Sequence, residues 1–221
     1  MSRIASHANG QAHAAARACA DLRGRALLRF IAFALANLLL FLPATRAQDS
    51  VVVLDPAKTT IAFTLDSTLH TVHGTFKLRS GQIHFDLGSG KVTGQIVVDA
   101  TSGDSENNGR DKKMHQEILE SQKYPEIIFT PAKVQGSLNP QAASQVELSG
   151  SFRIHGQDHD VTVSLAVDPP AGNQLRATAH FSVPYIKWGL KNPSTFIFRV
   201  SDTVDISIQA VGQLSADTAS H

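Results

Sequence analysis

The alternation of apolar and polar residues with a period of two constrains the fold of this chain more than any other feature. Successive side chains of a β-strand point to opposite faces of a sheet, so a strand that covers a core has an apolar residue at every second position. The alternation recurs between residues 61 and 210, most clearly in residues 146–154, 161–167 and 177–183. It predicts eight or nine strands, each with one apolar face.

Short polar connections separate these segments, among them Ser80-Gly81, Gly88-Ser89-Gly90 and Asn139-Pro140. Residues of these types are typical of turns. Strands that are joined by short connections pair as antiparallel neighbours. Because each strand has one apolar face, the strands are expected to share one interior. A β-sandwich and a closed β-barrel both satisfy these conditions.

Residues 107–121 break the alternation and predict a single helix between two strands. Met114 and Ile118 recur at helical spacing, and Ser105 and Asn107 are both suitable as the N-cap. We expect this helix to plug or flank one end of the stranded domain.

The N-terminal residues 1–47 have the order of a secretory signal peptide: a basic start, the apolar run 26–42, and the small-residue stretch 44–47. The part of this run without charged residues, residues 30–42, is shorter than the roughly 20 residues that span a membrane. Cleavage after Ala47 would leave a stranded domain (48–214) without a stable membrane span and a flexible tail (215–221). The sequence thus predicts a periplasmic or secreted protein, with an uncleaved N-terminal anchor as the alternative.

Removal of this leader changes the charge of the protein. The whole chain has 20 Lys and Arg residues against 19 Asp and Glu residues. Residues 1–47 contain six arginines and one aspartate, which leaves 14 basic and 18 acidic residues and a net charge of −4. A negative surface repels phosphate groups, which argues against nucleic acid as a partner.

Enzymatic motifs are absent from the sequence of the expected mature domain. The single cysteine, Cys19, lies in the leader, and neither a Gly-x-Ser-x-Gly elbow nor a phosphate-binding glycine loop follows it. On a strand, His70 and His73 would point to opposite faces, and His155 and His159 flank a turn. We predict neither catalysis nor a metal or other cofactor.

Five motifs occur in a characteristic order: His73-Gly74-Thr75-Phe76, Gly81–Asp86, Arg110-Asp111, Lys123–Phe129 and Leu148–Gly156. In this order the chain resembles the YceI-like family of lipid- or polyisoprenoid-binding proteins over nearly all of residues 51–212. The resemblance implies an eight-stranded antiparallel, lipocalin-like β-barrel with one helix inserted in a connection. It also implies an elongated apolar pocket, export from the cytoplasm and, in many members, a homodimer.

The candidate ligand-binding residues are apolar side chains expected on the inner face, together with one histidine. They are Ile61, Phe63, His70, Phe76, Leu78, Phe85, Ile96, Phe129, Phe152, Phe181 and Trp188. His70 would face inward if its strand begins early enough, and could then bind a headgroup or quinone oxygen. Packing within the core is the alternative interpretation of the apolar candidates, because an eight-stranded barrel can be filled by its own side chains.

These expectations lead to one main hypothesis and one alternative. The main hypothesis is an exported carrier or sequestering protein that buries a polyisoprenoid, an isoprenoid quinone or a fatty amide or acid in the barrel. The alternative is a stress-related protein-interaction module with a filled barrel and no lipid cargo.

Overall fold

The computed structural model describes residues 50–195 and 199–216, which belong to one compact unit, Ala47–His221. The predicted signal peptide and the last five residues lie outside the described residues. The elements are β1 (Ser50–Leu54), β2 (Thr60–Leu65), β3 (Val72–Asp86), β4 (Lys91–Asp104), α2 (Asn108–Lys113), η2 (Met114–Ile118), β5 (Glu126–Gly136), β6 (Ser144–Ile154), β7 (Gln157–Val167), β8 (Gln174–Val183) and β9 (Val204–Ala216). Strand β9 thus includes the first two residues of the predicted tail.

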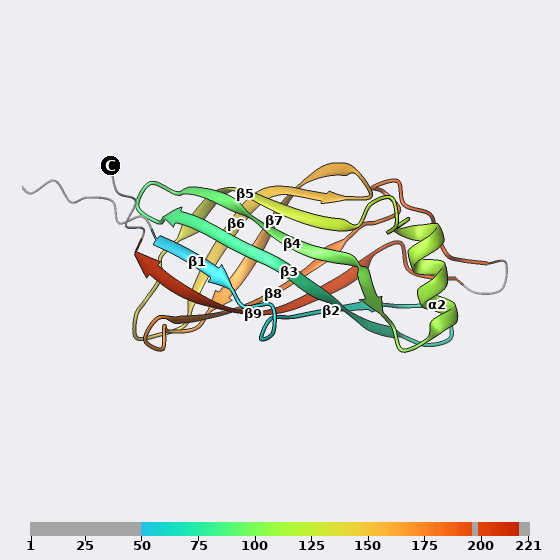
Figure 1. Cartoon of the computed structure of the whole chain (residues 1–221), viewed down its shortest axis with the longest axis horizontal. Helices are drawn as coiled ribbons and strands as arrows, with labels where there is room; N and C mark the ends of the chain where they lie inside the picture. Colours follow the sequence, from blue (N-terminus) through green and yellow to red (C-terminus); the bar gives the residue numbers. More distant parts are fainter. Residues whose placement is uncertain (1–49, 196–198, 217–221) are drawn as a thin grey trace, which may run out of the picture. The chain divides into compact units, whose positions relative to one another are not determined.

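The strands form one closed antiparallel barrel (Figure 1). From β2 the sheet runs through β9, β8, β7, β6, β5 and β4, and β4 pairs with β3 to close the circle. Closure leaves the long strands without exposed edges. The predicted eight-stranded barrel with one inserted helix is therefore confirmed, and the sandwich alternative is wrong.

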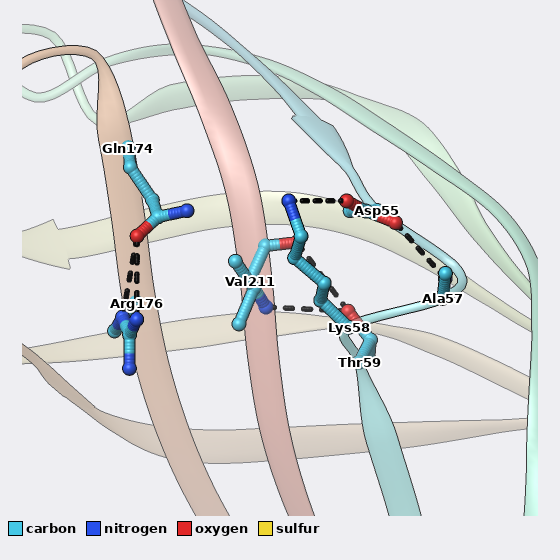
Figure 2. Close-up of polar contacts among 7 residues, drawn as sticks. All are labelled: Asp55, Ala57, Lys58, Thr59, Gln174, Arg176 and Val211. Atoms are coloured by element: carbon cyan, nitrogen blue, oxygen red, sulfur yellow. Dashed lines mark hydrogen bonds and ion pairs between the residues drawn. The ribbon is translucent and has the colours of Figure 1, made fainter.

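Strands β1 and β2 together occupy a single position in the barrel wall, since each pairs with both β3 and β9. The loop between them is fastened to β9: the Asp55 N–H donates to the Val211 carbonyl oxygen at 2.8 Å, and the Val211 N–H donates to Thr59 Oγ1 at 3.2 Å. Figure 2 shows this loop folded around Asp55, whose carboxylate accepts from the Ala57 N–H at 2.9 Å. Hydrogen bonding by Lys58, and then by Ala57, keeps the pKa of Asp55 below its ordinary value.

The predicted turn at Ser80-Gly81 is wrong, because β3 continues through these residues. A register shift between Leu78 and Ser80 marks a β-bulge, where one extra residue is inserted into the strand. The bulge changes which residues face inward, so Leu78 and Ile83 both line the interior although their spacing is odd. The Leu54 side chain of β1 lies against Gly81. A Cβ added at Gly81 would lie 2.7 Å from Leu54 Cδ1, so glycine is favoured at this position.

The helical segment lies between β4 and β5, as predicted, at one end of the barrel (Figure 1). Asn107 is the N-cap, and its side chain accepts from the N–H groups of Gly109 and Arg110. After six residues the α-helix widens into the π-helical turn η2. Leu119, directly after it, is buried in the barrel core. Neither helical segment in the described part of the chain is long and apolar enough to cross a membrane.

The interior is divided into two hydrophobic clusters. The helix-end cluster is rich in aromatic residues and includes Tyr185, Phe76, Phe152, Phe181 and Trp188. The second, aliphatic cluster is built around Val92, Val134, Val146, Leu148 and Val167, with Phe85 and Phe129 packed against it.

Candidate functional site

A cavity of about 200 Å³ lies inside the barrel. It is lined by 27 residues, of which Thr59 is the only one with a polar side chain. All thirteen residues of the aliphatic cluster contribute to the lining. On the side of the helix-end cluster, the lining includes Val98, Ile127, Phe152 and Phe181.

The alternating sequence of three consecutive strands explains why the wall is apolar. The residues that line the cavity are Val146, Leu148 and Phe152 on β6, Val163, Leu165 and Val167 on β7, and Ala177, Ala179 and Phe181 on β8. Between them, polar residues such as Glu147, Thr162 and Arg176 are exposed. Since the period is two in these three strands, their inner faces are apolar along the cavity.

Thr59 does not make the cavity polar. Its Oγ1 accepts from the Val211 N–H at 3.2 Å and donates to the Val211 carbonyl oxygen at 3.4 Å. The hydroxyl group is thereby used to hold β2 against β9. The wall consequently offers a ligand a hydrocarbon surface, which suits an apolar chain and lacks a pair of groups for acid–base chemistry.

Seven of the eleven predicted ligand-binding residues line this cavity: Ile61, Leu78, Phe85, Ile96, Phe129, Phe152 and Phe181. Their contact with a ligand remains a prediction. The sequence reasoning missed most of the aliphatic lining, such as Val146, Leu148 and Val167. The alternation places these residues on the inner face, so the signal that identifies them is present in the sequence.

The other four predicted residues lie outside the lining. The Phe63 and Phe76 rings pack against each other with their centres 5.4 Å apart. Trp188 packs in the helix-end cluster. The expectation that His70 faces inward is wrong, because β3 begins only at Val72 and His70 is exposed in the preceding connection. There the His70 backbone N–H donates to Ser67 Oγ at 3.4 Å.

A family model described as the YceI-like domain matches residues 53–212 of the chain, which is more than half of its length. The chain belongs to the YceI-like family. The match begins within β1 and ends within β9, so it covers nearly all of the barrel and the whole inserted helix.

Solved structures of similar proteins share this YceI-like fold. Burkholderia cenocepacia BcnA aligns with a TM-score of 0.61 and 20% identity, over 72% of this chain and 98% of that protein. A polyisoprenoid binding domain from Saccharophagus degradans, implicated in plant cell wall breakdown, aligns with a TM-score of 0.54 and 14% identity, over 74% and 98%. The Campylobacter jejuni YceI protein aligns with a TM-score of 0.54 and 18% identity, over 66% and 86%. No curated protein matches the chain.

In this YceI-like barrel the motif Arg110-Asp111 organises the entry to the helix. The Asp111 carboxylate accepts from the backbone N–H and the hydroxyl of Ser105, at 2.9 and 2.6 Å. Arg110 donates to the Ser105 carbonyl oxygen at 2.8 Å. Ser105 itself is buried. The motif thus fixes the end of β4 relative to the helix and does not extend into the cavity.

The residues after the helix hold the β6–β7 turn. The Tyr124 ring lies 4.5 Å from the His155 ring, and His155 pairs with Glu120 at 2.7 Å. This hydrogen bond is the main reason why the pKa of Glu120 lies below its ordinary value. Gly156 has a φ of 77° in this two-residue turn, and an added Cβ would collide with the Tyr124 ring. We therefore assign a structural role to Tyr124.

The remaining histidines do not converge on a metal site. His155 contacts Glu120, whereas His159 stacks on Trp188 with ring centres 4.2 Å apart. Within residues 50–195 and 199–216, no group of three or more His, Cys, Asp or Glu residues is arranged to hold a metal ion.

Proposed function

We propose that this protein is an exported carrier that holds one long apolar lipid chain in its barrel. The observation that carries the proposal is the composition of the cavity wall, where Thr59 is the only polar residue among 27. A site of this composition binds by burial of apolar surface, which contributes about 0.8 kcal/mol for each CH₂ group. The Saccharophagus degradans neighbour, which is described as a polyisoprenoid binding domain, supports the same class of ligand.

The size of the cavity favours a narrow ligand. Small-molecule sites commonly have volumes of roughly 300–1,000 Å³, and this cavity measures about 200 Å³. An extended isoprenoid or acyl chain can place part of its length in such a space. The cavity also argues against the alternative of a wholly filled barrel.

Binding without catalysis agrees with the chemistry of the wall. A lining of hydrocarbon side chains provides no nucleophile and no proton donor for a bound lipid. The predicted leader, residues 1–47, supports export, and the net charge of −4 after its removal disfavours adsorption to anionic membranes. The cargo would therefore be carried between membranes in an aqueous compartment.

The decisive experiment is native mass spectrometry of the protein purified from its native compartment, followed by extraction with organic solvent. The proposal predicts a bound species of several hundred daltons that the solvent releases. The N-terminal residue of the purified protein, read by intact mass, tests cleavage after Ala47. A ligand-free protein that also fails to take up prenyl lipids would overturn the proposal and favour the interaction module.

A further inference from the structure

His159 is a polar residue on the inner face of β7. It shares that face with Val161 and with Val163, which lines the cavity. In the register of β6 and β7, His159 is paired with Phe152, another residue of the cavity wall. The alternation of β7 therefore brings an imidazole to the border of an otherwise hydrocarbon interior.

The Nε2 atom of His159 is buried and has no hydrogen-bond partner within the described part of the chain. Such atoms are rare in native proteins, because a buried polar group without a partner loses its hydrogen bonds to water and gains nothing in return. One face of the ring is covered by Trp188, whose plane is within 5° of parallel. The Nε2 atom of His159 therefore lies in a packed environment and can still form a hydrogen bond.

A continuous aromatic contact runs from the cavity to this atom. The Phe152 ring lies 5.6 Å from the Trp188 ring, and Trp188 stacks on His159. Trp188 belongs to the irregular segment between β8 and β9. Strands β7 and β8 pair only at residues 165–167, so the ladder between them does not extend to His159. Trp188 therefore lies beside a part of β7 that pairs with β6 but not with β8.

We propose that His159 Nε2 binds the polar end of the lipid, with Trp188 moving aside as the chain extends from the cavity. This inference rests on the proposed carrier function and specifies its ligand: an uncharged lipid that ends in a hydroxyl or carbonyl oxygen. The Nε2 atom of an imidazole can pair with either group, because it donates in one tautomer and accepts in the other. On the inner face His159 is flanked by Val161 and paired with Phe152, and burial of a charged headgroup against such hydrocarbon side chains is costly.

The experiment compares two lipids that differ in one oxygen atom: geranylgeraniol and the hydrocarbon with the same carbon skeleton. The two are offered together to the mature protein, and native mass spectrometry gives the ratio of alcohol-bound to hydrocarbon-bound protein. In His159→Phe, which keeps an aromatic ring beside Trp188, the ratio is expected to fall roughly five- to tenfold from the wild-type value, the effect of one lost hydrogen bond. His159→Gln retains a hydrogen-bonding group and should preserve part of the preference.

The matched control is His180→Phe, since His180 is an exposed histidine on β8; its ratio should equal that of the wild type. Equal ratios in wild type and His159→Phe, or a His159→Gln ratio as low as that of His159→Phe, would overturn the role of His159 and leave the carrier function intact. Failure of the wild type to bind either lipid would instead overturn the carrier function itself. Urea unfolding of each variant verifies that the barrel is folded.

Discussion

Filling the cavity from its own wall tests whether that space holds the lipid. Ala177 lines the cavity on β8, between Ala210 of β9 and Val167 of β7, both of which line it as well. The substitution Ala177→Phe places a phenyl ring in this space. Because the cavity of about 200 Å³ can receive the ring, we expect the free energy of unfolding of the ligand-free protein to stay within about 1 kcal/mol of wild type, as burial of the ring offsets local strain.

The expected effect on binding follows from the volume that is lost to the ligand. A phenyl ring adds six carbon atoms and displaces about as many CH₂ groups of a bound chain. At about 0.8 kcal/mol for each group, the loss is about 5 kcal/mol, which weakens binding roughly 10³- to 10⁴-fold.

The assay is lipid occupancy by native mass spectrometry across a titration with geranylgeraniol. The matched control is Ala166→Phe on β7, whose wall position has the opposite parity to the lining residues Leu165 and Val167. It adds the same ring to the outside of the same wall and should bind as the wild type does. If Ala177→Phe takes up lipid with wild-type affinity, the chain does not occupy this cavity and the reasoning is wrong.

Three further changes test the packing of the barrel. Leu148→Ala removes a buried side chain from the wall and is expected to lower the free energy of unfolding by about 3 kcal/mol in urea titrations; a loss below about 1 kcal/mol would contradict the assigned burial. Asn107→Ala removes the helix cap and should cost about 1 kcal/mol, whereas Asn108→Ala, one residue later, should cost less. Burial, with a smaller contribution from Asp202, raises the pKa of Tyr185 to about 12. Between about pH 10 and 12 the folded state keeps the Tyr185 proton and the unfolded chain loses it, so the free energy of unfolding falls with rising pH, by about 1–2 kcal/mol after allowance for solvent screening. Tyr185→Phe should show a shallower fall over this range. A pH profile of the variant equal to that of the wild type would refute the assignment.

Much of the fold could be predicted from the sequence because the alternation acts locally and repeats. Residues 146–154 and 161–167 alternate cleanly, and they form β6 and β7 with the expected faces. The alternation cannot by itself distinguish a sandwich from a barrel, since both have one apolar face for each strand. A barrel is distinguished from a sandwich by the pairing of β3 with β4 and of β2 with β9, which only the tertiary structure determines. The barrel was predicted from the resemblance to the family.

Two local features escaped the sequence. The β-bulge of β3 resembled a turn. On either side of Ser80-Gly81 the apolar residues shift from even to odd positions, and such a shift is also expected where one strand ends and another begins. Strand β1 was missed because Val51, Val52 and Val53 are consecutive and show no alternation. Val53 is 47% exposed whereas Val52 is 6% exposed. Because both residues are valine, the sequence does not show which of them faces the core.

The candidate site was predicted only in outline. Ten of the eleven proposed binding residues were apolar, and seven of these line the cavity, but volume is a property of the whole interior and not of any one strand. Phe63 and Phe76 face inward like Phe85, yet the first two pack against each other while Phe85 lines the space. His159 shares the parity of Val161 and Val163, and this spacing is the sequence signal that places it on the inner face.

The distribution of side-chain size explains why this barrel is hollow in one part and filled in the other. Aromatic side chains are concentrated at the helix end, where Phe76, Tyr185 and Trp188 pack with Leu119. Elsewhere the wall includes small residues on neighbouring strands, namely Ala177, Ala179 and Ala210. An eight-stranded barrel has an interior just wide enough for its own side chains, so alanines at inward positions leave space that no neighbour fills. The hollow part can accept an apolar chain, and the aromatic border beside it contains His159, the residue expected to bind the polar end of that chain.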